Sequence, residues 1–195
     1  KAAGYIRTGF ECYSLPDDPM TKAFREGTAH YGSSGHQTGG RVNFVAVGSS
    51  SKSNLGDDYY AQNFYDLKSY KKCLNKGEFP TFRGMKLSKD DKIRQHATQQ
   101  LRSYFRIDFK QFERNLKINP KEYFGKEIEY LDEMIEDGLV ILSNDGIEIT
   151  ELGRDFSQNI TNVFDKYDPP TKSYNARLET IKRAKSDQAK VQELT

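Results

Sequence analysis

Residues 139–149 read LVILSNDGIEI, in which two short apolar runs flank the turn residues Asn144, Asp145 and Gly146. This pattern predicts a β-hairpin whose turn needs backbone at positive φ. Three helical patterns come before the hairpin and one follows it. That order of elements predicts a small winged-helix-like domain over residues 86–167.

The three helical patterns before the hairpin have clear ends. Ser88 and Asp91 form a capping-box pattern ahead of the first helix, and Asp108 is expected to cap the second, which ends before Pro120. The third is expected to be the most regular helix, ending at Gly138. Its apolar side is carried by Phe124, Ile128, Leu131, Met134 and Ile135, and that of the first helix by Ile93, Ala97, Leu101 and Phe105.

After the hairpin, Thr150 is expected to cap one more helix. Its predicted core positions are Leu152, Phe156, Ile160, Val163, Phe164 and Tyr167. Beyond Pro170 the chain is rich in Lys, Ala, Gln and Glu, so residues 168–195 are expected to form a polar tail or one loosely attached helix.

The amino-terminal part combines strand and helix patterns, which makes the predicted fold class α+β. Residues 5–13 resemble a strand, and acidic residues before Met20 can cap a short helix over residues 20–27. The glycine-rich segment 32–40 is expected to be a mobile or ligand-facing loop. Residues 44–47 suit a short buried strand, with pairing parallel to the first strand as one option.

Residues 48–63 read GSSSKSNLGDDYYAQN and predict a loop of small residues between that buried strand and a helix. Small residues let backbone N–H groups approach a ligand, although an ordinary solvated loop is the other interpretation. The helix is expected to begin at Asp58 and to stop at Gly77. Its apolar positions are Tyr60, Phe64, Leu67, Tyr70 and Leu74.

Composition limits the possible functions. The 195 residues have room for one domain, or for one small domain plus part of another, and we favour the second. Lys and Arg number 30 against 28 Asp and Glu, a net charge of +2 that argues against a nucleic-acid partner. The apolar runs are too short to span a membrane. Two cysteines, Cys12 and Cys73, suggest free thiols in a reducing cytoplasm, and the chain reads as if it begins inside a domain.

No constellation of residues carries chemistry by itself. The three histidines, His30, His36 and His96, are scattered in sequence. His36 is the better candidate for contact with a carboxylate or a metal because of its glycine-rich surroundings, and an exposed loop histidine without a role is the other interpretation. The acidic pairs that end at Asp18, Asp58 and Asp91 fall at predicted helix starts and are explained by capping. The basic residues are expected to be solvated, including Lys71, Lys72, Arg94, Arg102 and Arg106.

Several motifs, taken in order, resemble the carboxy-terminal part of the oxygen-independent coproporphyrinogen III oxidase family of radical S-adenosylmethionine (SAM) enzymes. The resemblance runs from about Gly4 to Tyr167. It rests on the segments 9–18, 47–48, 60–63, 83–84, 87–91, 107–109, 137–140 and 150–154 together with the glycine-rich loop.

The resemblance implies that residues 1–85 are the end of a partial α/β barrel and that residues 86–167 are the family's small carboxy-terminal domain. The family uses a [4Fe–4S] cluster and SAM to generate a radical that converts propionate side chains to vinyl groups in haem synthesis. This chain lacks the family's cysteine triplet, so the cluster loop and most of the barrel are expected upstream. By itself the chain is then expected to be an inactive, cytoplasmic and monomeric piece, whose partners are the upstream barrel and a porphyrinogen-like substrate.

The resemblance assigns site residues to this chain by their position in the motifs only, because the residue types differ from those of the family. Ser33 and Ser34 stand where the family has an aromatic residue and a glutamine near a second SAM, and Lys52 stands where it has an isoleucine. Glu11 and Cys12 replace an Asp-His pair. Lys52 is interpreted either as a point charge for a carboxylate of SAM or substrate, or as a solvated lysine. A radical SAM relative with another substrate, in haem degradation or methyl transfer, and a free winged-helix binding module are the alternatives.

Overall fold

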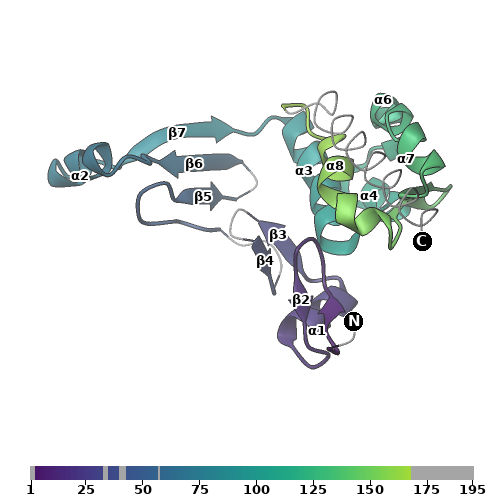
Figure 1. Ribbon diagram of the computed structural model, residues 1–195. Coiled ribbons are helices and arrows are strands. Elements are labelled where there is room, and N and C mark those ends of the chain that lie inside the picture. Colours follow the sequence, from purple (N-terminus) through teal and green to yellow (C-terminus); the bar gives the residue numbers. More distant parts are fainter. Residues whose placement is uncertain (1–2, 33–34, 40–42, 57, 168–195) are drawn as a thin grey trace, which may run out of the picture. The chain divides into compact units, whose positions relative to one another are not determined.

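The computed structural model of the protein describes residues 3–32, 35–39, 43–56 and 58–167, which form helices and strands in a mixed arrangement (Figure 1). The chain divides into two compact units between Ile107 and Asp108. The first unit holds strands β1 to β7 and helices α1 to α3. The second holds helices α4 to α8 and the hairpin of β9 and β10, and strand β8 (Arg106–Asp108) spans the division.

The amino terminus forms a tight hairpin, so the prediction of a single strand over residues 5–13 is wrong. Strands β1 (Ile6–Arg7) and β2 (Tyr13–Ser14) pair antiparallel. The chain reverses between them because Gly9 has a φ of 131° and Glu11 a φ of 57°, which an extended strand excludes.

Helix α1 (Pro19–Glu26) confirms the predicted short helix and its cap. The Asp18 carboxylate accepts the Met20 N–H at 2.7 Å, and Gly27 ends the helix in the left-handed conformation. The glycine-rich segment that follows forms strands β3 (His30–Gly32) and β4 (Gly35–Gln37) rather than one continuous loop. Ser33 and Ser34 lie outside the described residues.

The segment from residue 44 to residue 63 differs most from its prediction. Residues 44–47 make one antiparallel bridge, from Phe44 to Asn54, and leave Val45 and Val47 exposed by 73% and 89%, so the predicted buried strand is wrong. The small-residue loop and the predicted start of the helix contain a third hairpin, after β1–β2 and β3–β4. Its strands are β5 (Lys52–Leu55) and β6 (Tyr59–Asn63), joined through Gly56 at a φ of 62°.

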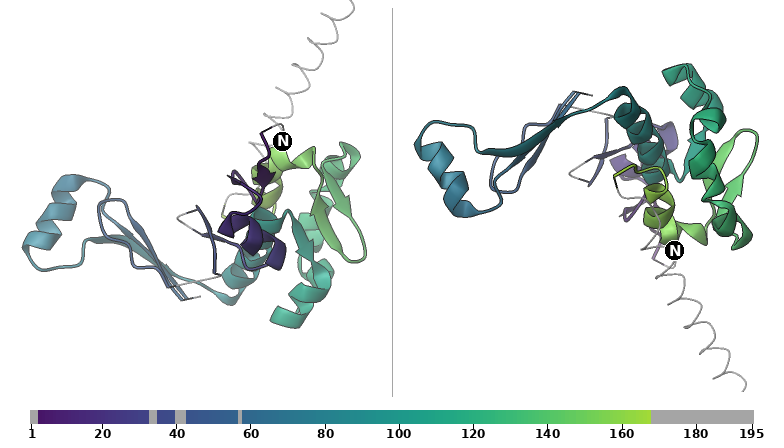
Figure 2. Two further views of the ribbon diagram at one scale, coloured as in Figure 1. Left: turned by 90° about the horizontal axis from the view of Figure 1, so that it is seen from below. Right: turned by 90° about the horizontal axis from the view of Figure 1, so that it is seen from above.

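Only the second half of the predicted helix is helical. Helix α2 (Leu67–Asn75) begins after Asp66, whose carboxylate accepts the Ser69 N–H at 2.7 Å, so Asp58 lies in a turn and not at a helix start. Strand β7 (Thr81–Lys86) returns along β6 to complete an antiparallel sheet in the order β5, β6, β7. Figure 2 shows α2 beyond the end of this sheet rather than over one of its faces. The described strand pairs of this unit are antiparallel, which rules out the parallel option for them.

Helix α3 (Lys89–Tyr104) confirms the predicted helix in both its cap and its buried face. Ser88 and Asp91 form the capping box, and the four predicted apolar positions are almost fully buried. The Tyr104 hydroxyl donates to the Ala29 carbonyl at 2.6 Å, while the Arg102 carbonyl accepts the Phe10 N–H at 2.8 Å. These bonds join α3 to the amino-terminal segments of the same unit.

His36 packs against the same end of α3. Its Nε2 lies 3.3 Å from the Arg102 carbonyl oxygen, and a Cβ built on Gly9 would lie 2.2 Å from Nε2. Gly9 therefore provides the space for the imidazole. Burial of the ring lowers the pKa of His36, and the bond to Arg102 and the charge of Glu11 oppose this shift. His36, the histidine that the sequence singled out, therefore has a structural role at the end of α3.

In the second unit, helix α4 (Phe109–Leu116) confirms the predicted helix capped by Asp108. The predicted third helix is wrong, because this stretch breaks into α5 (Pro120–Tyr123), α6 (Gly125–Glu129) and α7 (Asp132–Glu136). The first break falls at Phe124, whose φ of −104° and ψ of 25° are not helical. Its fully buried ring makes edge-on contacts with Phe112, Tyr123 and Phe164, which favour this conformation.

The hairpin of β9 (Val140–Leu142) and β10 (Gly146–Ile149) is confirmed, but its turn has no residue at positive φ. The Ser143 hydroxyl instead accepts the N–H groups of Asp145 and Gly146. The predicted helix capped by Thr150 is divided into a 3₁₀ turn, η1 (Gly153–Phe156), and α8 (Ser157–Asn162), neither of which has a side-chain N-cap bond. The Thr150 hydroxyl does accept the Gly153 N–H at 3.0 Å.

The predicted core of this last segment holds only in part. Ile160, Val163 and Phe164 are buried, whereas Leu152 and Tyr167 are exposed. The predicted polar tail lies outside the described residues. No helix within the described ranges is both long enough and apolar enough to cross a membrane.

Gly153 and Gly125 form a matched pair for testing how tightly the second unit packs. A Cβ at Gly153 would lie 1.9 Å from the Leu139 carbonyl oxygen, whereas one at Gly125 would meet nothing within 4 Å. We expect Gly153→Ala to lower the free energy of unfolding by about 2–3 kcal/mol because backbone must move. Gly125→Ala should change it little or raise it by up to about 1 kcal/mol. Urea denaturation measures both, and equal effects would contradict this account.

The lowered pKa of His36 predicts a pH dependence of stability. Because the folded state holds the proton less tightly than the unfolded state, the contribution of His36 is complete above pH 6.5 and declines as the pH falls toward the folded pKa. Between pH 8 and pH 5.5 the free energy of unfolding should therefore fall less for His36→Gln than for the unaltered protein. Urea denaturation at both pH values tests this, and identical pH dependence in the two proteins would rule it out.

Candidate functional site

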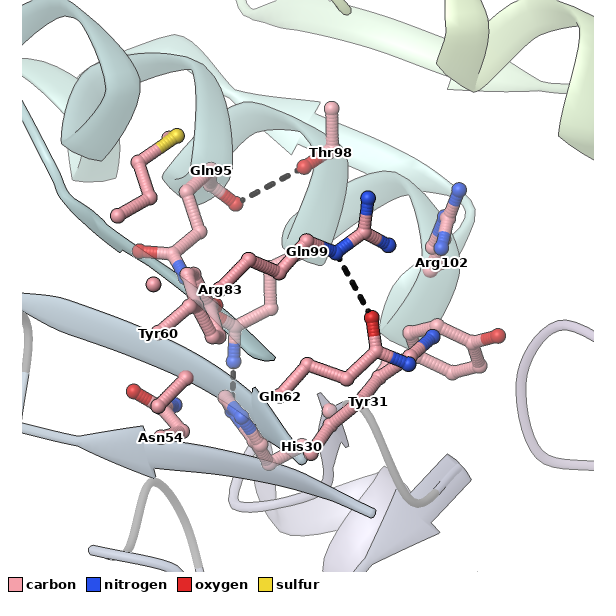
Figure 3. Close-up of a pocket in the computed structure, with 15 residues that line it drawn as sticks. His30, Tyr31, Asn54, Tyr60, Gln62, Arg83, Gln95, Thr98, Gln99 and Arg102 are labelled. Carbon is pink, nitrogen blue, oxygen red and sulfur yellow. Dashed lines mark hydrogen bonds between the residues drawn. The ribbon is translucent and has the colours of Figure 1, made fainter. Parts of the chain in front are cut away.

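A pocket of about 570 Å³ lies within the first unit, between the sheet and α3 (Figure 3). Strands β3, β5, β6 and β7 form its walls together with one face of α3. Its fifteen lining residues are His30, Tyr31, Gly32, Lys52, Asn54, Tyr60, Ala61, Gln62, Arg83, Gly84, Met85, Gln95, Thr98, Gln99 and Arg102. The volume falls in the range that holds small organic ligands.

The charges of the lining are all of one sign. Lys52, Arg83 and Arg102 are cations, and none of the fifteen residues is Asp or Glu. The four amide side chains and the tyrosines add neutral hydrogen-bonding groups. Such a lining favours a ligand with negative charge, because each uncompensated cation in a pocket is stabilised by an anion.

Arg83 is oriented by its neighbour on the adjacent strand. Gln62 on β6 faces Arg83 on β7 in the sheet register, and the Arg83 Nε donates to Gln62 Oε1 at 2.9 Å. Figure 3 shows the Arg83 side chain extending into the pocket. The bond uses Nε alone, and among the described residues the terminal nitrogens of Arg83 have neither a hydrogen-bond partner nor an acid within ion-pairing distance.

Arg102 reaches the pocket from the last turns of α3. Its guanidinium carbon lies 5.0 Å from the centroid of the Tyr31 ring, a stacking contact that holds the group in place. The buried Nε atom has no hydrogen-bond partner within the described part of the chain. The same holds for the buried Oδ1 atom of Asn54 on the opposite wall. A bound ligand is one way to satisfy such atoms.

Two hydrogen bonds join the helical and sheet walls. The Gln99 amide donates to Nδ1 of His30, and the Gln95 amide donates to the Tyr60 hydroxyl. Side chains of α3 that face the pocket are Gln95, Thr98, Gln99 and Arg102, at spacings that place them on one helix face. The pocket therefore has a preformed polar lining.

The structure places the predicted site residues unequally. Lys52 on β5 lines the pocket, so the interpretation of a charge near a ligand remains open as a prediction. Cys12 and Glu11 do not line it, and the Cys12 Sγ lies 3.9 Å from the Ser14 hydroxyl. His96 hydrogen-bonds to Gln100, in keeping with its structural interpretation.

Sequence reasoning missed the two arginines. Arg102 was expected to be solvated, and Arg83 entered only as part of a motif. The polar stripe of α3 at helical spacing was a signal that could have indicated a lined cavity. No group of three metal-ligating side chains occurs among the described residues.

Comparison with known proteins gives a consistent answer. The HemN C-terminal domain family matches residues 87–156. The oxygen-independent coproporphyrinogen III oxidase of Pseudomonas aeruginosa is 34% identical over 168 residues, covering 86% of this chain and 36% of the relative. That of Escherichia coli K12 is 33% identical over 165 residues, covering 85% and 36%.

A solved structure agrees. Coproporphyrinogen III oxidase (HemN) from Escherichia coli, described as a radical SAM enzyme, matches with a TM-score of 0.79 and 33% identity over 85% of this chain and 38% of that chain. This chain thus spans little more than a third of the length of these relatives. In sequence and in fold, this chain is similar to the carboxy-terminal part of the oxygen-independent coproporphyrinogen III oxidases, and its residues 87–156 match the HemN C-terminal domain family.

Proposed function

We propose that this chain is the carboxy-terminal part of a radical SAM oxidoreductase that decarboxylates coproporphyrinogen III oxidatively to protoporphyrinogen IX in haem biosynthesis. The observation that carries the proposal is similarity over about 85% of the chain, in both sequence and backbone, to enzymes of that name. The cationic lining of the pocket is consistent with it, because the substrate carries carboxylate side chains.

The proposed domain organisation follows the family. Residues 1–85 would end a partial α/β barrel, and residues 86–167 would form a winged-helix-like domain. The start of the HemN C-terminal domain match at residue 87 supports the boundary. The upstream part of the barrel would be the main partner, in a cytoplasmic and monomeric enzyme without a nucleic-acid partner.

The two cofactors of radical SAM chemistry fit this chain differently. Two separate cysteines, and no cluster of three metal ligands among the described residues, do not fit an iron–sulfur cluster, so no step at the cluster is assigned to these residues. SAM has a carboxylate and polar groups that match the amide and cationic lining of the pocket. Lys52 is the proposed contact, with Ser33 and Ser34 proposed by position only.

The replacements at Glu11, Cys12 and Lys52 give a second candidate function. They favour radical SAM chemistry on another substrate, as in haem degradation or methyl transfer, because Lys52 adds a charge where the family has isoleucine. The test is to assay the complete, cluster-reconstituted protein for vinyl products from coproporphyrinogen III. SAM cleavage without decarboxylation would refute the haem-synthesis assignment and favour the second candidate.

The exposed position of Lys52 limits the expected effect of replacing it. If its ammonium group meets a carboxylate of SAM or substrate, Lys52→Gln should weaken binding of that ligand by up to about fivefold, because exposed ion pairs contribute up to about 1 kcal/mol. Calorimetric titration of the complete protein measures the affinity. Lys71→Gln, on α2, is the matched control. No difference between the two variants would assign Lys52 to solvent.

A further inference from the structure

The two arginines of the pocket lie on different walls and reach the same cavity. Arg83 comes from the sheet and Arg102 from α3, and both are drawn in Figure 3 beside the amides that line the space between sheet and helix. Neither has an ion-pair partner among the described residues. The half-buried Arg102 gains most from a negative charge in this cavity, and the exposed Arg83 gains less because water already stabilises it.

The fixed orientation of each group suits a carboxylate. The bond from Nε to Gln62 directs Arg83 while its two terminal nitrogens remain open. Stacking on Tyr31 covers a face of the Arg102 guanidinium, and its Nε is buried, so the two terminal nitrogens, which make no hydrogen bond among the described residues, are the atoms left for a ligand. A planar guanidinium with an open edge binds carboxylates through two parallel hydrogen bonds, which an ammonium group cannot do.

We infer that Arg83 and Arg102 form a two-point carboxylate-binding site that anchors carboxylate side chains of the substrate. Asn54 lines the same cavity, and its buried Oδ1 has no hydrogen-bond partner among the described residues. The ligand class is a polycarboxylate of tetrapyrrole size, and this identity rests on the proposed function. The carboxylates held here are bound and oriented, and no bond to them is made or broken.

Burial predicts unequal roles for the two arginines. Arg102 is half-buried and stacked, so its hydrogen bonds to a carboxylate are poorly screened and their loss should weaken binding by about tenfold or more. Arg83 is exposed, and its loss should cost only a few-fold because water screens the interaction. Arg102→Lys should bind more tightly than Arg102→Gln, since lysine keeps the positive charge but lacks the planar guanidinium that forms two parallel hydrogen bonds.

The probe is coproporphyrin III, the oxidised and fluorescent form of the proposed substrate, titrated into the complete protein. Arg83→Gln, Arg102→Gln and Arg102→Lys are compared with Arg25→Gln, an exposed arginine at the end of α1 that does not line the pocket. Circular dichroism checks folding, because Arg102 also contacts Tyr31. The tetramethyl ester of coproporphyrin III reports what binding is left without carboxylates.

We expect Arg102→Gln to weaken binding most, Arg102→Lys less than Arg102→Gln, and Arg83→Gln by only a few-fold. Binding by Arg25→Gln should be unchanged, and the ester should bind little. Equal binding of acid and ester, no effect of either arginine, or no binding of coproporphyrin III by the unaltered protein would overturn the inference. Arginine-dependent binding of the acid without vinyl products in the enzymatic assay would support the site and count against the proposed function, which keeps the two failures distinct.

Discussion

The structure of the first unit depends on how the carbonyl group of Arg102, in the last turn of α3, is satisfied. Carbonyl groups in the last turn of a helix lack intrahelical partners, and this one accepts the Phe10 N–H and faces His36. The contacts bring two hairpins against the end of α3. They also fix the backbone from which the Arg102 side chain turns toward Tyr31 and the pocket, so a single acceptor links the amino terminus to the wall of the candidate site.

Helix ends marked by side-chain caps were predictable from the sequence. Asp18, Ser88 and Asp108 begin helices as expected, because a cap is a local interaction between neighbouring residues. The β5–β6 hairpin was missed because Tyr60, Phe64 and Leu67 also fit helical spacing, and its pairing with β7 depends on residues some twenty positions away. The break at Phe124 likewise depends on distant aromatic rings.

Of the charged residues in the candidate site, only the one selected through the family resemblance was predictable from the sequence. Lys52 was selected by position and lines the pocket. Arg102 was assigned to solvent because a basic residue on a mixed-charge helix carries no local sign that Tyr31 will stack on it. Arg83 depends in the same way on Gln62, its partner across the sheet. A binding site between strands and a helix is formed by residues that are distant in sequence. A single sequence lists these residues but does not indicate which of them lie next to one another in the fold.

The contact between Gly9 and His36 limits which substitutions these two positions can tolerate. A side chain at position 9 and an imidazole at position 36 cannot occupy the same space. Position 9 also has a φ of 131°, so a side chain there is strained whatever residue stands at position 36. Position 36 can change while position 9 stays glycine, so glycine should be retained across relatives more strictly than the histidine it faces in the neighbouring hairpin.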